Sequence, residues 1–550
     1  MLVLLSRANP RYILRAIPTR LFSTAMARNY ADAIDKINGL QTNASILEAL
    51  RKAGPRMNSQ SLPEMCEYVR RIGYEPSAFN ALNIIHVTGT KGKGSTCAFA
   101  ESILRHHHET TGVRTLRTGL FTSPHLVAVR ERIRIDGRPV SEEVFARYFF
   151  ECWDRLEETK EQYFENSKDR VKDVKGARTH ADKPTYFRFL TLLAFHVFMQ
   201  EKVDVAIMEV GVGGEFDSTN IVERPAATGV ASLGLDHVAV LGNTIDSIAW
   251  HKAGIFKEGV PAFAVEQPPE AMEVLVRRAE EKKAPLTIIS HKDADQFKDI
   301  PLGLAGAHQR HNAALATSLC RSWLTQHFPS HTPPTTPTIP TSFLSGLRQV
   351  SWPGRGQTLP NSRTKHAVPE GEVDNLTWYL DGAHTTESLQ ACTEWFRDAV
   401  GKKRDEGVER ILVFNCTNGR NAQRLLEVVA RVQGDVEFDE AVFCTNITFR
   451  IGYSSGLSLV PHHPPIPIDN VNNMVETDTQ LTAQHAFATS WQQLVPGART
   501  HVVRSVEEAV VHAVARAREM RGTGRKVQVL TTGSLILVGN QLAVMGVEPD

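Results

Sequence analysis

The sequence predicts an α/β protein with parallel sheets, divided into a larger N-terminal and a smaller C-terminal domain. In both parts of the chain, short apolar runs rich in β-branched residues alternate with segments of helical periodicity. This alternation implies parallel strands joined by crossover helices. The chain has 550 residues, which is too long for one hydrophobic core and favours two domains.

Composition narrows the class of protein. The net charge is +1 and the hydrophobic content is 42%, so we expect a globular protein that binds no nucleic acid. No apolar run approaches the roughly 20 residues that span a bilayer, so we expect no membrane insertion. The seven cysteines form no C-x-x-C pair, which indicates neither a disulfide framework nor a thiolate metal site.

Residues 1–28 differ from the rest of the chain. They contain five arginines and several hydroxyl residues, and no acidic residue occurs before Asp32. This pattern is typical of a mitochondrial transit peptide, although a disordered basic tail has the same composition. Met26 offers an internal start. We therefore expect a mitochondrial form, in the matrix or on the inner membrane side, and a cytoplasmic form.

A glycine-rich turn follows the apolar run at residues 84–87 and precedes a helical segment at 97–104. It contains Gly89, Gly92, Lys93, Gly94 and Ser95. A strand, glycine turn and helix in this order favour phosphate binding by backbone amides, the helix N-terminus and the lysine. The strict motif G-x-x-x-x-G-K-[ST] is not met, because Gly94 separates Lys93 from the serine. An ordinary tight turn is the alternative.

Polar residues follow three further predicted strands of the N-terminal domain. Ser123 lies beyond the strand that starts at residue 118, Glu209 ends the strand at 203–210, and His237 follows the strand at 227–233. In an open parallel sheet, ligands bind beyond the carboxyl ends of the strands. The sequence therefore predicts that these residues and the glycine turn form one site.

The linker between the domains is predicted at the Pro/Thr-rich segment 331–340 or just after it, near residues 352–355, and the domains are predicted at 29–345 and 346–550. Candidate strands in the second domain are 376–380, 411–415, 441–445 and 527–531, with helices at 387–400 and 506–521. Two segments are predicted to be flexible insertions: the charge-rich 157–183, and the irregular, Pro/His/Thr-rich 452–497.

Eleven short blocks together resemble the folylpolyglutamate synthase family, within the Mur-ligase-like ATP-dependent amide ligases. They are LQTN at 40–43, VTGTKGKGS at 87–95, TSPHL at 122–126, EVGVGG at 209–214, DSTN at 217–220, LDH at 235–237, HKAGI at 251–255, HQRHNA at 308–313, WPGR at 352–355, DGAH at 381–384 and TGS at 532–534. The resemblance implies an N-terminal P-loop domain of the Mur-ligase type and a smaller, Rossmann-like C-terminal domain.

The resemblance also implies a reaction. ATP would phosphorylate the γ-carboxylate of a reduced folate, as mono- or polyglutamate, and L-glutamate would attack the acyl phosphate. We expect an acid–amino-acid ligase that acts as a monomer, with Mg²⁺ and a monovalent cation as further ligands. Dihydrofolate synthase, which joins glutamate to dihydropteroate, is the alternative enzyme. A nucleotide-binding regulatory protein without ligase activity is the alternative of another class.

Each candidate site residue takes a role from the same resemblance. Ser123, Glu209 and His237 would bind metal, and Lys93 would hold phosphates with the loop residues Gly89, Gly92, Gly94 and Ser95. Lys93, His384 and Lys252 would be catalytic, with Lys252 carbamylated. The remaining nucleotide contacts would be His308, Gln309, Asn312, Arg355 and Asp381, the last two reaching the site from the linker and the second domain.

The same residues also allow structural roles. Glu209 could cap a neighbouring amide, Ser123 could be a turn hydroxyl, and His237 a half-buried loop residue. Lys252 could be a plain helix lysine, and Arg355 a surface ion pair. The side chains at 308–312 could cap a helix.

Overall fold

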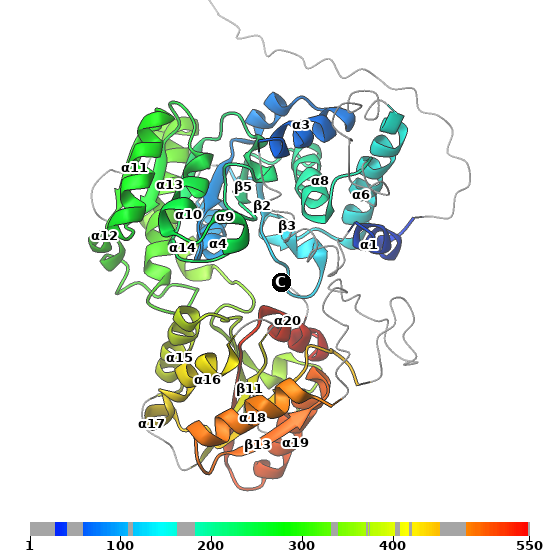
Figure 1. The fold of residues 1–550 in the computed structure, drawn as a ribbon, viewed down its shortest axis with the longest axis vertical. Helices are drawn as coiled ribbons and strands as arrows, with labels where there is room; N and C mark the ends of the chain where they lie inside the picture. The colour runs from blue at the N-terminus through cyan, green and yellow to red at the C-terminus, as the bar shows by residue number, and fades with distance from the viewer. Residues whose placement is uncertain are drawn as a thin grey trace, which may run out of the picture.

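The computed structural model describes residues 28–40, 59–107, 114–161, 182–331, 339–369, 372, 374–401, 407–416, 421–450 and 480–547. It has two lobes, each built on one sheet with helices on both faces (Figure 1). Within these ranges, no helix is long and apolar enough to cross a membrane. The predicted transit peptide, apart from Arg28, lies outside the described residues, and so does most of each predicted insertion.

The N-terminal sheet has eight strands in the order β4-β3-β2-β5-β1-β6-β7-β8. Its parallel strands are β1 (Ile85–Thr88), β2 (Thr118–Phe121), β5 (Val205–Glu209), β6 (Ala227–Val230), β7 (Ala262–Val265) and β8 (Leu286–Ile289). β3 (Ile133–Ile135) and β4 (Arg138–Pro139) add an antiparallel edge. The central strands β1, β2, β5 and β6 are buried along their whole length, as expected for strands with helices on both faces.

Helices cover this sheet in two main layers. On one face α4 (Lys93–His106), α13 (Gln309–His327) and α14 (Thr341–Gln349) share a core with Val87, Leu120 and Ile207. On the other face, α1 (Tyr30–Asn38), α3 (Ser61–Arg71), α6 (Glu142–Glu158) and α8 (Tyr186–Gln200) pack with Phe121 and Met208. α10 (Ile245–Lys252) and α11 (Pro269–Glu281) pack beside β7.

The C-terminal sheet has six strands in the order β13-β12-β11-β14-β10-β9. These are β9 (Gln357–Pro360), β10 (Leu376–Leu380), β11 (Val408–Phe414), β12 (Glu440–Cys444), β13 (Arg499–Val503) and β14 (Lys526–Thr532). All neighbours pair in parallel except β9 and β10. α15 (Thr386–Val400), α16 (Ala422–Ala430) and α18 (Thr482–Leu494) cover one face, and α19 (Val506–Arg521) and α20 (Leu535–Val544) cover the other.

The predicted α/β class is confirmed, and the four candidate strands of the second domain correspond to β10, β11, β12 and β14. The prediction of an irregular insertion at 452–497 is wrong in its last part, because residues 482–494 form α18. Trp491 of this helix is fully buried and packs edge-to-face on Phe438. The Pro/His/Thr-rich composition of the residues before α18 favoured an irregular segment, so the helix was not predicted. It is stabilised by packing in the core of the second domain.

The predicted boundary between residues 345 and 346 falls inside α14. This helix packs closely on α4, and Phe343, Leu347 and Val350 belong to the core of the first sheet. The core of the N-terminal domain therefore continues to Val350, and the chain passes to the C-terminal sheet through residues 351–356.

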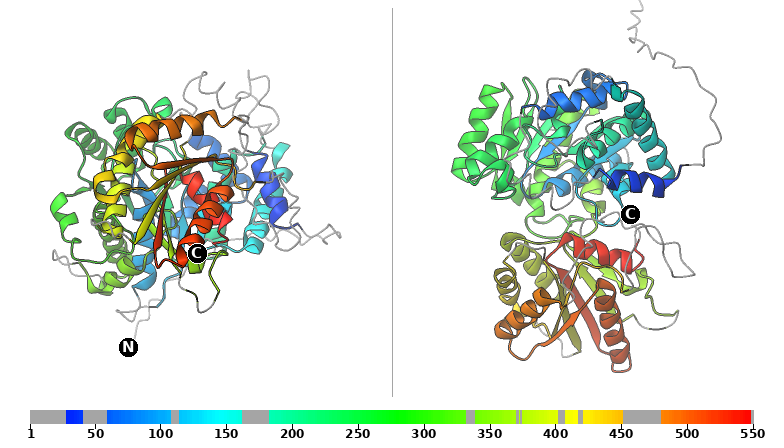
Figure 2. Two further views of the ribbon diagram at one scale, coloured as in Figure 1. Left: turned by 90° about the horizontal axis from the view of Figure 1, so that it is seen from below. Right: turned by 45° about the vertical axis from the view of Figure 1, so that its right-hand side comes forward.

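A loop of the first domain packs into the second. Leu126 and Val127, between β2 and β3, belong to the same apolar cluster as Val538 of α20. A Cβ on Gly539 would lie 2.1 Å from the Leu126 carbonyl oxygen, so only glycine fits there. The buried Glu131 carboxylate holds this loop by accepting the backbone amides of residues 126–128 at 2.6 to 3.0 Å. Figures 1 and 2 show α20 on the side of its lobe that faces the first domain.

Candidate active site

The loop between β1 and α4 lies in the first domain, at the carboxyl edge of the N-terminal sheet. Gly92 is the N-cap of α4 with φ +80°, a conformation that favours glycine. A Cβ at Gly92 would lie 2.2 Å from Asn312 Oδ1, so a side chain there would collide with α13. Lys93 is the first residue of α4, which places its charge beside the exposed amides of the helix N-terminus.

Two lysines converge on one carbonyl oxygen of this loop. Lys93 Nζ donates to the Gly89 carbonyl at 2.9 Å, and Lys252 Nζ donates to the same oxygen at 2.7 Å. Lys252 is buried, and burial together with the nearby Lys93 holds the pKa of its ammonium well below the usual range. Lys93 and the exposed amides at the N-terminus of α4 therefore give the loop a positive potential that would stabilise a bound anion.

Glu209 brings a carboxylate to the same loop. It is the last residue of β5 and is 4% exposed. Its Oε2 accepts the backbone amide of Ser123 at 2.9 Å, and a Cβ on Gly94 would lie 3.5 Å from that oxygen. Burial raises the pKa of Glu209, although the charge of Lys93 opposes the shift. Glu209 thus does cap an amide, as the structural alternative stated, and also faces the phosphate loop.

His237 reaches this region from a longer loop than predicted. β6 ends at Val230, and His237 is the N-cap of the short helix α9 (Val238–Leu241), with φ +51°. Desolvation lowers the pKa of this histidine, as do Lys93 and Lys252, whereas Asp236 raises it. The two lysines that share the Gly89 carbonyl therefore also act on His237.

The predicted metal ligands Ser123, Glu209 and His237 differ in the donor atoms that they offer. A hydroxyl and a buried carboxylate offer the hard oxygen atoms that Mg²⁺ prefers, and a divalent cation would offset the cost of burying Glu209. These two residues fit a magnesium site. His237 offers an imidazole nitrogen, which suits transition metals better than magnesium.

The α13 residues form a polar chain that supports the loop. Gln309 Nε2 donates to Ser95 Oγ at 3.4 Å, and Asn312 Nδ2 donates to Gln309 Oε1 at 2.8 Å. His308 is the N-cap of α13, but its side chain makes no capping hydrogen bond. Gln309 and Asn312 thus tie the start of α4 to the neighbouring helix α13.

Arg355 and Asp381 lie together at the start of the second domain. Asp381 accepts the backbone amides of Gly356 at 2.7 Å and Ala383 at 2.9 Å. Burial raises the pKa of this carboxyl, and the charge of Arg355 opposes the shift. Arg355 Nη1 donates to the Gly354 carbonyl at 3.3 Å, so the pair orders the segment that connects the domains.

His384 lies in the second domain, near the loop of the first domain that contains Asp236. Its Nδ1 lies 2.8 Å from the Gly382 carbonyl oxygen. Burial acts to raise the pKa of Asp236 in the first domain, but His237, Lys91 and His384 together hold it below the usual value. His384 is therefore close enough to the Asp236–His237 loop for their charges to interact.

Sequence reasoning did not single out Asp217. This buried carboxylate accepts the amide of Val212 at 3.0 Å and both the amide and the hydroxyl of Thr219, at 3.0 and 2.7 Å. It thereby holds the glycine turn after Glu209 to η3 (Ser218–Ile221). The signal was available in the DSTN block, since Asp followed by hydroxyl residues is typical of a helix N-cap.

The chain is similar to known proteins over nearly its whole length. No protein-family model matches it. The chain is 43% identical over 535 residues to folylpolyglutamate synthase of Neurospora crassa, covering 96% of this chain and 93% of the relative. It is 41% identical over 534 residues to folylpolyglutamate synthase of Saccharomyces cerevisiae strain FostersO, covering 94% and 87%.

The fold is also similar to a solved structure. Mycobacterium tuberculosis folylpolyglutamate synthase complexed with ADP superposes with a TM-score of 0.65 and 21% identity, over 94% of this chain and all of that one. This likeness shows the two-domain fold, whereas the two fungal proteins match in sequence along nearly their whole length. The chain therefore belongs to the folylpolyglutamate synthase family.

Proposed function

We propose that this protein is a folylpolyglutamate synthase, a ligase that adds L-glutamate to the γ-carboxylate of reduced folates at the expense of ATP. The observation that carries the proposal is the nearly full-length similarity to two fungal folylpolyglutamate synthases. The ADP bound by the mycobacterial relative and the cationic loop at Gly89 support ATP as the phosphoryl donor.

The geometry suggests how the first step is assisted. A carboxylate is a poor electrophile until it carries a phosphate leaving group, and phosphoryl transfer depends mainly on positioning and charge neutralisation. We assign to Lys93 and the amides of the glycine loop the task of holding the β- and γ-phosphates. Ser123 and Glu209, with His237, would hold Mg²⁺, which when bound neutralises phosphate charge.

Lys252 is proposed to act as a carbamate. Carbamylation needs a neutral amine, and the lowered pKa of the buried Lys252 favours that form. A carbamate would replace the amine by an anion whose oxygens could act as ligands for a second metal ion beside the phosphates. This change would also relieve the repulsion between Lys252 and Lys93.

The second half of the reaction is proposed to occur between the domains. Arg355, Asp381 and His384 lie on the second domain or its connection, yet His384 acts on Asp236 of the first. Closure of the domains would bring these residues over ATP bound at the loop and would exclude water from the acyl phosphate. His384 is placed to contact phosphate or the incoming glutamate.

Mass spectrometry of the products tests this function. The purified protein is incubated with Mg-ATP, L-glutamate and either tetrahydrofolate monoglutamate or dihydropteroate. Products lengthened by glutamate from the folate alone support the proposal. Product from dihydropteroate alone would instead indicate dihydrofolate synthase, and ATP hydrolysis that is independent of glutamate and yields no amide would exclude both ligases.

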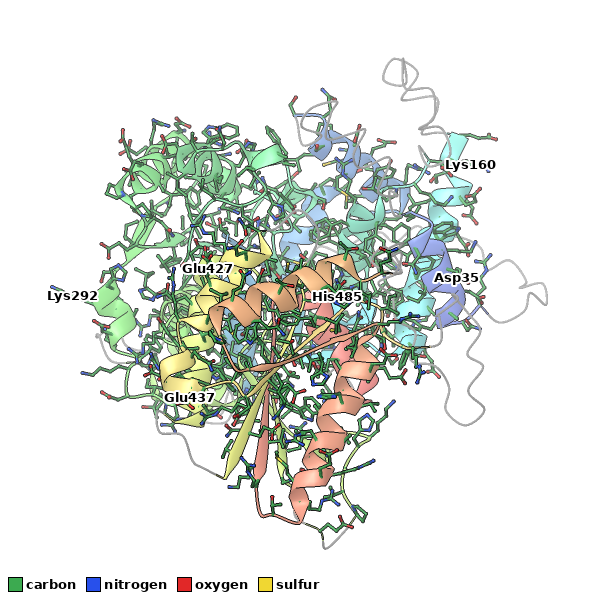
Figure 3. The ribbon with its side chains drawn as sticks, turned by 60° about the horizontal axis from the view of Figure 1, so that its bottom comes forward. Asp35, Lys160, Lys292, Glu427, Glu437 and His485 are labelled. Atoms are coloured by element: carbon green, nitrogen blue, oxygen red, sulfur yellow. The ribbon has the colours of Figure 1, made fainter. Side chains whose placement is uncertain are left out.

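Replacement of Lys93 by alanine is expected to reduce turnover at saturating ATP by at least about 10²-fold, the scale found when one charge-stabilising group is removed. The fold should persist, because Lys93 contributes only two bonds to loop carbonyls. The measurement is the ligation rate, with circular dichroism as a check. Lys292→Ala on α12 (His291–Asp295), an exposed lysine at the margin of the view in Figure 3, is the matched control. Near-normal turnover in Lys93→Ala would refute the assignment.

The metal ligands are tested by magnesium titration of the ligation rate. Glu209→Gln keeps the shape of the side chain but loses its charge, so the magnesium concentration for half-maximal rate should rise about tenfold or more. His237→Ala should shift it in the same direction. Glu427→Gln, at a partly exposed glutamate on α16 of the second domain (Figure 3), should leave the titration unchanged. Any site variant that titrates like the wild type is not a ligand.

Arg355→Ala tests domain closure. If Arg355 stabilises the closed state, its loss should lower kcat and raise the KM for ATP together. Water should then reach the intermediate, so more phosphate is released than glutamate incorporated. Arg348→Ala, an exposed arginine at the end of α14, is the control. If Arg355→Ala slows phosphate release and glutamate incorporation equally, so that the ratio of phosphate released to glutamate incorporated stays near one, Arg355 does not couple closure to chemistry.

We also propose two cellular pools, a mitochondrial form that uses residues 1–28 as its signal and a cytoplasmic form that starts at Met26. The support is the arginine-rich, acid-free composition of this segment. A fluorescent protein fused behind residues 1–28 should accumulate in mitochondria, and replacing the arginines by glutamines should abolish import. Wholly cytoplasmic fluorescence of the first fusion would contradict the targeting role.

A further inference from the structure

A cluster of two histidines and a glutamate lies in the second domain, away from the residues discussed above. Glu440 is the first residue of β12, His501 lies in β13, and His512 lies in α19. The strand register explains why they meet. Glu440 pairs with Arg499, and His501 is two residues further along β13, so these three side chains share the face that α19 covers.

The ring nitrogens of both histidines point at the same carboxylate oxygen. His501 Nε2 lies 2.9 Å from Glu440 Oε1, and His512 Nε2 makes a short contact with that atom. The two rings are 4.5 Å apart between centroids. The ligand atoms of all three residues lie within 4.8 Å of one another, which no other group of three His, Cys, Asp or Glu residues achieves in the described part of the chain.

The surroundings hold the glutamate in place. Glu440 is only 1% exposed, and its second oxygen accepts a bond from Arg499 Nη2 at 3.2 Å. Arg499 also contacts Glu409 at 2.5 Å, and Arg516 binds Glu409 at 2.8 Å. The buried carboxylates of Glu440 and Glu409 therefore both have arginine partners. The side chain of His501 remains substantially exposed. The cluster is preorganised and open to solvent.

We propose that Glu440, His501 and His512 form a binding site for a divalent transition-metal ion of the zinc type, with water completing the coordination. Two imidazoles and one carboxylate are a ligand set that zinc accepts. A tetrahedral ion at about 2 Å from each ligand separates the ligand atoms by about 3.3 Å, so small side-chain rotations complete the site. Arg499 acts as the outer partner that orients the ligating carboxylate.

The place of the site in the fold indicates its role. Asp381 follows the carboxyl end of β10, whereas Glu440 stands at the amino end of β12 in the same run of parallel strands. The metal therefore lies at the edge of the sheet opposite Asp381. It ties β12 and β13 to α19, and it stabilises the second domain rather than taking part in ligation. The inference is independent of the proposed ligase activity.

Cobalt(II) is the probe, because it replaces zinc at such sites and its visible absorption reports nitrogen ligands in a tetrahedral field. The full-length protein, in excess Mg²⁺ and without ATP, is titrated with Co²⁺ and then with Zn²⁺. One equivalent of Co²⁺ should bind with visible bands, Zn²⁺ should displace it, and bound Zn²⁺ should raise the unfolding temperature of the second domain by several degrees.

Substitutions decide whether these residues are the ligands. His501→Gln and His512→Gln should each lose the bands and weaken Zn²⁺ binding by about 10-fold or more, while His485→Gln, an exposed histidine on α18 (Figure 3), should keep both. Glu440→Gln is a weaker test, because it also leaves Arg499 with one partner fewer. The proposal is overturned if the wild type shows no such bands, or if both histidine variants bind Co²⁺ as the wild type does. In that case the cluster is a hydrogen-bonded pair of imidazoles on a carboxylate.

Discussion

The carbonyl oxygen of Gly89 accepts hydrogen bonds from two lysine amino groups, and the arrangement of the site depends on this contact. Lys252 is buried, and its proximity to Lys93 disfavours a second positive charge at the same oxygen. The carboxylate of Glu209 lies close enough to Lys93 for their charges to interact. A polyphosphate bound at the N-terminus of α4 would add contacts to the exposed amides of the helix. Glycine is required at position 92, because α13 leaves no room for a side chain there.

The second domain extends this site through few contacts. Arg355 and Asp381 order the connecting segment, and His384 acts on Asp236 across the gap between the domains. The first two residues act through direct hydrogen bonds, whereas His384 acts on Asp236 through its charge. The apolar contact between the domains includes Leu126, Val127 and α20. Apolar packing and polar contacts between the two domains are thus supplied by different segments of the chain.

Much of the fold could be predicted because local signals and tertiary structure agree. The strand at β1, its glycine turn and α4 follow from short-range patterns, and the strand ends bring Glu209 and Ser123 to one edge through the parallel topology. Features that depend on contacts between distant segments could not be predicted. α18 is stabilised as a helix because Trp491 packs in the core of the second domain. Glu440 and His501 meet through the register of β12 and β13, and His512 meets them because α19 packs on these strands. No spacing rule in the sequence brings residues so far apart into one cluster.

The packing of Leu126 against Gly539 also constrains how the protein is made. The loop that carries Leu126 is synthesised early, between β2 and β3, but its apolar partner α20 leaves the ribosome after every other described element. The N-terminal sheet can form as soon as its own strands are complete. Leu126 and Val127 must then remain uncovered during translation of the whole second domain. A nascent chain with such a persistent apolar patch is a natural client for chaperones, and a premature stop before α20 would leave the patch permanently exposed to aggregation.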